Sequence, residues 1–183
     1  DGSIERRKFL DSYISMYNHE YLNKLLSYNK LLQQRNAMLK EPNGFDETYL
    51  SILDDKLSML GTAIFQVRQK AVAELSERTK KFYTTISSTE ETGIIYESQL
   101  QNNDMKFLLD KNYERDKFLS YTSVGIHRDD LLFTFDNELL KNVASQGQKK
   151  SFLLALKFAQ YQLTKEFKNG QKPILLLDDL FDK

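Results

Sequence analysis

The sequence predicts a mixed α+β protein in which an antiparallel coiled-coil hairpin of two helices precedes a smaller α/β region. Apolar residues repeat at heptad spacing in residues 19–40 and 46–83, and a turn separates the two stretches. Only two prolines occur in 183 residues, so few points interrupt a helix. After residue 84 the pattern changes to short runs typical of strands, followed by another long helix.

The composition excludes several classes of protein. With 40% hydrophobic and 28% charged residues, the chain is globular and not disordered. The 26 basic residues equal the 26 acidic ones, so any contact with DNA must come from a local patch. The absence of cysteine excludes disulfides and thiolate zinc sites and is compatible with a reducing cytoplasm. No stretch approaches the ~20 apolar residues of a membrane span, so we expect a cytoplasmic protein without a membrane partner.

A first helix is predicted over residues 4–16, with Ser3 as its candidate N-cap. Arg6 and Arg7 in this helix have two interpretations. They contact phosphate or an acidic partner, or they form a solvated basic turn, and the second interpretation is favoured.

The coiled-coil hairpin is predicted from two heptad seams, which are apolar except at Arg35. The first consists of Tyr21, Leu25, Tyr28, Leu32, Arg35 and Leu39, and the second of Leu50, Leu53, Leu57, Leu60, Ile64, Val67 and Ala71. The turn signal at residues 41–44 lies between them, so the second helix should fold back along the first. A polar cluster at residues 33–36 interrupts the first seam, and we expect it to set the register of the pair instead of binding a ligand.

The region after the hairpin is predicted to alternate between strands and helices. Residues 93–100 have the composition of a strand. Asp104 should cap a helix over residues 105–121 that buries Phe107, Leu108 or Leu109, and Phe118. Residues 131–135 should form a strand that returns, after a turn, as a second strand at 139–143.

The last forty residues have the layout of half a nucleotide-binding site. Ser145-Gln146-Gly147-Gln148 opens a helix that runs to about residue 167, and its start offers N–H groups and a positive dipole end to a phosphate. Residues 174–177 are predicted to form a buried parallel strand that ends on Asp178 and Asp179. In open α/β sheets, ligands bind at this end of the strands.

Each half of this pattern also has a simpler explanation. The serine turn is compatible with an ordinary helix cap, and the acidic pair with a strand that enters an acidic turn. Their order and their separation of about thirty residues favour the signature and Walker B elements of an ATP-binding-cassette head.

Five separated stretches, in the same order, resemble the RecF family of bacterial DNA replication and repair ATPases, which are related to SMC proteins. These stretches are residues 5–11, 28–40, 125–131, 145–150 and 173–179. They span nearly the whole chain. The resemblance implies a fold in which the coiled-coil hairpin is an arm attached to the C-terminal lobe of an ABC-type ATPase head.

The resemblance also implies roles for individual residues. Residues 145–148, with Ser145, Gln146, Gly147 and Gln148, match the signature motif, which contacts the γ-phosphate of ATP bound by the opposing protomer of a head-to-head homodimer. Asp178 matches the Walker B aspartate that holds Mg²⁺. Asp179 stands where related ATPases usually have a catalytic glutamate that orients or deprotonates the attacking water. The side chain of aspartate is shorter than that of glutamate, which suits slow hydrolysis of ATP.

The resemblance divides the chain into three parts. Residues 1–18 match the end of the first head lobe and a connecting helix, residues 19–83 the arm, and residues 84–183 the second lobe. None of the seven glycines lies in a P-loop context, so the Walker A lobe is missing from this sequence. The chain is thus expected to be an internal fragment that cannot hydrolyse ATP alone, with an exposed apolar surface at residues 174–177.

The family implies an ATP-dependent dimer that binds double-stranded DNA near single-strand gaps and helps RecO and RecR type partners load RecA. Two alternatives remain open. The chain is a non-enzymatic coiled-coil scaffold, or it belongs to the head of another SMC-type repair ATPase, which predicts a far longer coiled coil. The family motif at residues 125–130 is equally compatible with a structural turn and with a ligand contact by His127 or Arg128.

Overall fold

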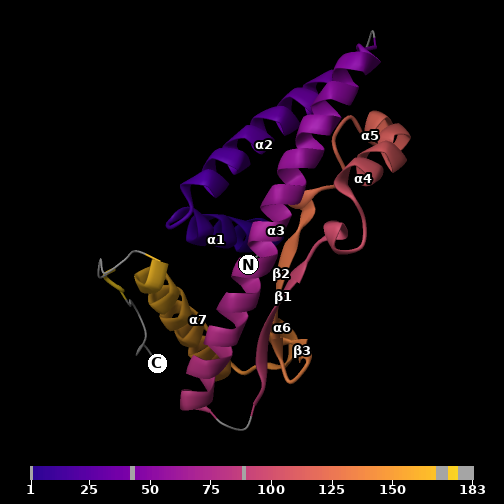
Figure 1. Cartoon of the computed structure of the whole chain (residues 1–183). Helices are drawn as coiled ribbons and strands as arrows, with labels where there is room; N and C mark the ends of the chain where they lie inside the picture. The colour runs from indigo at the N-terminus through magenta and orange to yellow at the C-terminus, as the bar shows by residue number, and fades with distance from the viewer. Residues whose placement is uncertain (1, 42–43, 88–89, 168–172, 177–183) are drawn as a thin grey trace. The chain divides into compact units, whose positions relative to one another are not determined.

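The computed structural model describes residues 2–41, 44–87, 90–167 and 173–176. Its helices and strands follow one another along the chain in Figure 1. The elements are α1 (Ser3–Ser15), α2 (His19–Met38), α3 (Glu47–Ile86), β1 (Thr92–Glu97), the 3₁₀ turn η1 (Gln99–Gln101), α4 (Met105–Lys111), α5 (Tyr113–Leu119), the 3₁₀ turn η2 (Ile126–Arg128), β2 (Asp130–Phe135), β3 (Glu138–Leu139), α6 (Leu140–Val143) and α7 (Gln146–Phe167). The predicted mixed α+β class is confirmed.

The chain packs into two compact units. The first comprises residues 1–69 and 96–130, and the second residues 70–95 and 131–183. Helix α3 contributes to both. The functional boundaries expected at residues 18 and 83 stay a prediction. No helix in the described ranges is long and apolar enough to span a membrane.

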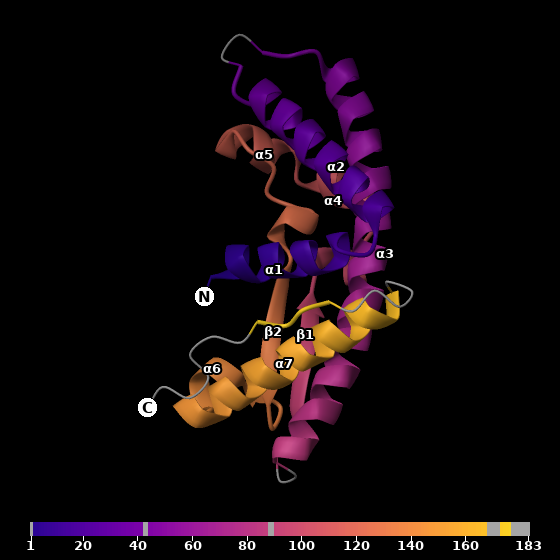
Figure 2. The ribbon, with the colours of Figure 1, turned by 90° about the vertical axis from the view of Figure 1, so that its left-hand side faces the viewer.

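The first unit contains the predicted helical hairpin. Helix α2 and the first half of α3 lie side by side and run in opposite directions (Figures 1 and 2). Asn18 starts α2, because its side chain accepts a hydrogen bond from the Tyr21 N–H at 2.9 Å. The buried seam includes Tyr21, Tyr28 and Arg35 from α2, Leu39 directly after it, and Leu50, Leu53, Leu57 and Ile64 from α3. The heptad pattern therefore predicted the pairing correctly.

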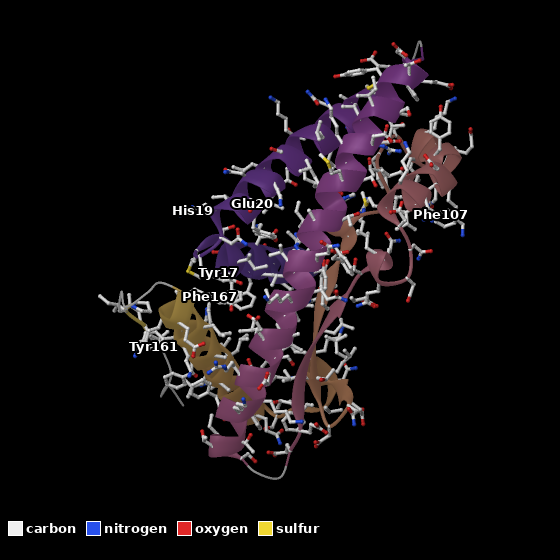
Figure 3. All side chains as sticks on the ribbon, viewed as in Figure 1. Tyr17, His19, Glu20, Phe107, Tyr161 and Phe167 are labelled. Atoms are coloured by element: carbon white, nitrogen blue, oxygen red, sulfur yellow. The ribbon has the colours of Figure 1, made fainter. Side chains whose placement is uncertain are left out.

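The predicted helix over residues 105–121 is wrong in one respect, because it is two helices. The Asp104 side chain caps α4, as predicted, by accepting hydrogen bonds from two backbone N–H groups. The side-chain amide of Asn112 donates to the Leu108 carbonyl oxygen at 2.8 Å, and α4 ends there. Phe107 of α4 and Phe118 of α5 are 52% and 88% exposed, against the prediction that they are buried. Figure 3 shows Phe107 on α4.

The sheet has the strand order β1-β2-β3, and β1 ends at Glu97, earlier than predicted. Strands β2 and β3 are antiparallel, with Thr134 opposite Leu139. Asp136 and Asn137 join them with φ values of 50° and 66°, as a two-residue hairpin turn requires. The predicted return strand over 139–143 is wrong beyond Leu139, because residues 140–143 form α6 and turn Leu140 into the core.

Helix α7 crosses one face of the sheet within the second unit (Figure 2). The rings of Phe152 and Phe133 lie 5.4 Å apart between their centroids, and Phe158 lies 5.8 Å from Phe82 of α3. Leu153, next to Phe152 on the same helix, is exposed. The first pair holds the beginning of α7, and with it the Ser145 turn, against β2, and the second holds the middle of α7 against α3.

The segment 173–176 is not the buried strand that the sequence predicted. It has no regular secondary structure, and Ile174 and Leu176 are 88% and 86% exposed. A parallel strand is buried only between neighbouring strands and covering helices. In the described part of the chain, the sheet consists of β1, β2 and β3 and does not include this segment. The exposed apolar surface expected at residues 174–177 is present at Ile174 and Leu176, residue 177 lies outside the described residues, and the capping of this surface by self-association or by an end of the chain stays a prediction.

Candidate functional site

The four residues predicted to contact ATP form the turn that starts α7, which we call the signature turn (residues 145–148). Two reciprocal hydrogen bonds shape it. The Ser145 Oγ accepts from the Gln148 N–H at 3.2 Å, and the Gln148 Oε1 accepts from the Ser145 N–H at 2.8 Å. This is a capping box, in which each side chain satisfies a backbone donor of the other residue. Ser145, Gln146 and Gly147 are all exposed, so a second molecule can reach the turn.

Gly147 is not required by the fold. A Cβ added to it would meet the Ser145 Oγ at 4.0 Å, which is ordinary contact, and the backbone has no positive φ there. Gly125 shows the opposite situation. Its φ is 117°, and an added Cβ would lie 2.7 Å from the hydroxyl of Tyr28. The absence of a side chain at Gly147 therefore suits the close approach of a group from outside the chain.

The predicted magnesium ligand Asp178 and the predicted catalytic Asp179 lie outside the described residues. Their distance from the signature turn is thus not defined, and both roles stay predictions. Within the described ranges, no group of three or more His, Asp or Glu side chains is arranged to hold a metal ion.

The two family stretches at residues 5–11 and 125–131 pack against each other in the first unit. The Arg6 guanidinium forms two hydrogen bonds with the Asp130 carboxylate, at 2.8 and 2.7 Å. The Arg7 Nη1 donates to the Asp129 carbonyl oxygen at 2.6 Å. The favoured interpretation of these arginines as a solvated basic turn is wrong, since both hold α1 to the start of β2.

Arg68 of α3 is the centre of a buried polar network beneath this contact. Its Nη2 lies 2.8 Å from an Asp11 oxygen, and its Nη1 lies 2.8 Å from the Ile126 carbonyl oxygen and 3.2 Å from an Asp129 oxygen. The hydroxyl of Tyr96 also donates to Asp129. Burial raises the pKa of Asp129, while the Tyr96 hydroxyl and the Arg68 charge oppose that rise. The network joins α1, α3 and η2.

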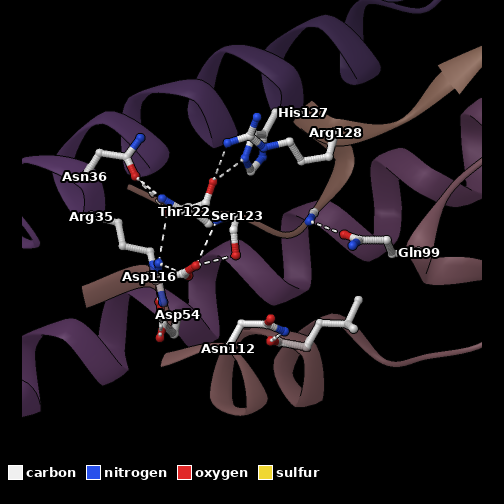
Figure 4. Close-up of polar contacts among 12 residues, drawn as sticks. Arg35, Asn36, Asp54, Gln99, Asn112, Asp116, Thr122, Ser123, His127 and Arg128 are labelled. Carbon is white, nitrogen blue, oxygen red and sulfur yellow. Dashed lines mark hydrogen bonds and ion pairs between the residues drawn. The ribbon is translucent and has the colours of Figure 1, made fainter. Parts of the chain in front are cut away.

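His127 and Arg128 belong to a hydrogen-bonded structural turn (Figure 4). The His127 Nε2 lies 3.1 Å from the Thr122 carbonyl oxygen, which can only accept, so Nε2 carries the proton. The Nδ1 lies 3.0 Å from the Tyr28 hydroxyl. Burial lowers the pKa of His127 to about 4, so the ring is neutral at pH 7. Arg128 donates to the same Thr122 oxygen at 3.2 Å. These contacts favour the structural interpretation of the motif.

The polar cluster at residues 33–36 also has a structural role, as predicted. Arg35 is completely buried, with Nε 2.6 Å from an Asp54 oxygen of α3 and Nη1 2.7 Å from an Asp116 oxygen of α5 (Figure 4). The Asn36 Oδ1 accepts from both the N–H and the hydroxyl of Thr122, each at 2.7 Å. The sequence did not indicate that Asp54 and Asp116 are buried, because a lone aspartate on a helix is normally solvated.

Comparison with known proteins identifies the relatives of this chain, although no protein-family model matches it. Two curated proteins named DNA replication and repair protein RecF, from Flavobacterium johnsoniae and Parabacteroides distasonis, are each 44% identical to it over 100% of its residues. The chain is thus similar to RecF along its whole length. It spans about half the length of these RecF proteins, 52% and 50% respectively.

Solved RecF structures agree with this relationship. The structure of the recombination mediator protein RecF with ATP, described as part of the RecFOR pathway, matches 98% of the chain with a TM-score of 0.91 and 34% identity. The structure of RecF with ATPrS matches with a TM-score of 0.90 and the same identity. The chain covers 51% of each RecF molecule. The fold described above is therefore that of one half of RecF.

Proposed function

We propose that this chain supplies the arm and the second head lobe of an ATP-dependent DNA repair protein of the RecF type. The signature turn carries the proposal: it is exposed, it begins a 22-residue helix, and the fold does not require its glycine. A homologue solved with ATP supports the choice of ligand. The complete protein, in this proposal, combines these 183 residues with an ATP-cradling half that contains a Walker A motif.

The turn would bind the γ-phosphate of ATP held by the opposing protomer. The first turn of α7 leaves backbone N–H groups without partners inside the helix, and Gln146 and Gly147 occupy those positions. The positive end of the helix dipole adds a favourable field for an anion. The Ser145 hydroxyl accepts from the Gln148 N–H and can still donate its own hydrogen to a phosphate oxygen. Two copies would therefore close around ATP.

Asp178 would hold Mg²⁺, which neutralises charge on the phosphates, and Asp179 would orient the attacking water. An aspartate reaches less far than the glutamate usual at this position, so hydrolysis should be slow. ATP would then act mainly as a clamp that keeps the dimer closed.

The closed dimer would bind double-stranded DNA near gaps and act with RecO and RecR type partners in loading RecA. The homologues named for DNA replication and repair, and the RecFOR pathway of the solved RecF, support this part of the proposal. The lengths of α2 and α3, 20 and 40 residues, favour a short arm over the long coiled coil of an SMC protein.

The proposal is tested by measuring the association of the complete protein with sedimentation velocity, with and without ATP and Mg²⁺. We expect ATP to produce a dimer, Ser145→Arg to abolish it, and Asp178→Asn to weaken it. Ser51→Arg, on an exposed position of α3, is the matched control and should dimerise normally. Association that is independent of nucleotide in every variant would support the scaffold alternative and overturn the proposal.

A further inference from the structure

We propose that Glu90, in the connection between α3 and β1, is a positioning residue that holds the signature turn in its ATP-binding shape. The inference rests on the proposed function of that turn. It assigns a role to a residue that lies outside the signature turn, 58 positions from Gln148 in the sequence. The two residues belong to the same compact unit.

The first observation is that the side-chain amide of Gln148 is held in one orientation. Its side-chain amide uses both ends at once: Oε1 accepts from the Ser145 N–H at 2.8 Å, and Nε2 donates to the Glu90 Oε1 at 2.9 Å. The Glu90 contact therefore decides which way the amide faces, since the carboxylate accepts only from the NH₂ end. A reversed amide would direct its NH₂ group at the Ser145 N–H and break the capping box.

The second step is that Glu90 itself is held in place. The Ser87 hydroxyl donates to its other oxygen, Oε2. The Ser87 N–H in turn donates to the Tyr83 carbonyl oxygen at 2.9 Å, which continues the hydrogen bonding of α3. On the other side of Glu90, the Glu91 N–H donates to an Asp136 oxygen at 2.7 Å. The Glu90 carboxylate is thus held by Ser87 at the end of α3, and the backbone beside it is held by the β2–β3 turn.

These contacts form a continuous path from the last turn of α3 to the backbone that would face ATP. The path runs from Ser87 through Glu90 and Gln148 to Ser145. A charged acceptor makes a stronger hydrogen bond than a neutral one, so the Glu90 contact should dominate the orientation of the Gln148 amide. A structural change in the last turn of α3 would then alter the ability of the signature turn to bind ATP.

The inference is tested in the complete protein by measuring the dimer dissociation constant at saturating ATP and the ATP affinity of the monomer. We expect Glu90→Ala to weaken dimerisation about tenfold, the loss typical of one hydrogen bond to a charged group, with ATP binding by the monomer unchanged. Glu90→Gln keeps an acceptor oxygen without the charge and should restore part of the affinity. Glu91→Ala is the matched control, because its carboxylate pairs with Lys80 and should not affect dimerisation.

A double-mutant cycle separates positioning from general loss of structure. If Glu90 acts through Gln148, the variant with both Glu90→Ala and Gln148→Ala should dimerise no worse than Gln148→Ala alone. Additive losses, or equal behaviour of Glu90→Ala and Glu91→Ala, would overturn the inference. Ser145→Arg is measured beside them: if it also leaves ATP-dependent dimerisation intact, the proposed function itself has failed.

Discussion

Arg35 of α2 and Asp116 of α5 form an ion pair from which solvent is completely excluded, with 2.7 Å between Nη1 and Oδ2. The same guanidinium also holds Asp54 of α3 at 2.6 Å. One cation therefore joins three helices whose residues are far apart in the sequence. Because two carboxylates depend on it, its removal would leave buried negative charge without compensation.

The first prediction concerns this cation. Arg35→Met fills similar volume but removes the charge, and we expect it to lower the free energy of unfolding by about 3–5 kcal/mol, the cost of breaking a buried ion pair on one side. Chemical denaturation followed by circular dichroism measures this change. Arg115→Met, which removes an exposed arginine from α5, is the matched control and should alter stability by no more than about 0.5 kcal/mol. Similar values for the two variants would refute a stabilising role for the network.

The second prediction follows from the buried His127. Its pKa falls from the ordinary 6.5 to about 4, because burial disfavours the charged ring. Between pH 6.5 and pH 4 the unfolded chain binds a proton on this ring that the folded chain does not. The effect of His127 on the free energy of unfolding is therefore most favourable above pH 6.5, and this stability is lost as the pH falls toward 4.

The variant His127→Gln removes this titration and should retain a donor for the Thr122 carbonyl oxygen. Between pH 7.5 and 4.5, we expect the wild type to lose about 2–3 kcal/mol more stability than the variant. Denaturation curves at several pH values measure the difference, with His19→Gln as the control at an exposed position. Parallel pH profiles for wild type and His127→Gln would contradict the assignment of a neutral buried ring.

The sequence predicted those parts of the fold that depend on local patterns. The heptad seams of α2 and α3 determine which faces meet, and Asp104 caps α4 through backbone groups two and three residues away. The positive φ values at Asp136 and Asn137 likewise arise within one turn. Each of these features is decided by neighbours in the sequence, so a single chain reveals it.

The parts that could not be predicted depend on partners distant in the sequence. Asp54 and Asp116 look like solvated helix residues until α2 brings Arg35 between them. The contact from Gln148 to Glu90 has no sequence signal, because neither residue type nor spacing identifies it. The exposure of Phe118 depends on the Asn112 side chain, which ends α4 and redirects the chain. Features that depend on contacts between distant residues therefore could not be predicted from the sequence.

The third prediction concerns Gly147, for which stability and function should change in opposite directions. In a helix, alanine is favoured over glycine by about 0.5–1 kcal/mol, and the added Cβ would make only an ordinary contact with the Ser145 Oγ at 4.0 Å. Gly147→Ala should thus leave the protein as stable as the wild type or slightly more so. The same methyl group would obstruct the approach of a phosphate, so ATP-dependent dimerisation should weaken at least about tenfold.

Thermal denaturation and sedimentation in the presence of ATP measure these two effects. Gly2→Ala, at a position where an added Cβ meets nothing within 4 Å, is the control for dimerisation. If Gly147→Ala were to dimerise as tightly as Gly2→Ala, the glycine would have no role in contacting the nucleotide.

The fourth prediction separates the two acidic residues that follow the apolar run. In the complete protein, Asp179→Asn should lower the rate of ATP hydrolysis by about 100-fold or more, the usual contribution of a positioned base, while the ATP-dependent dimer persists. Asp178→Asn should instead weaken both dimerisation and hydrolysis, because the proposed role of Asp178 is to hold the Mg²⁺ that both processes need. Glu166→Gln removes a carboxylate that pairs with Arg78 on the surface and serves as the control. Phosphate release and sedimentation, measured on the same samples, distinguish the two roles. Equal losses of dimer in both aspartate variants would show that Asp179 binds the nucleotide and does not act on the water.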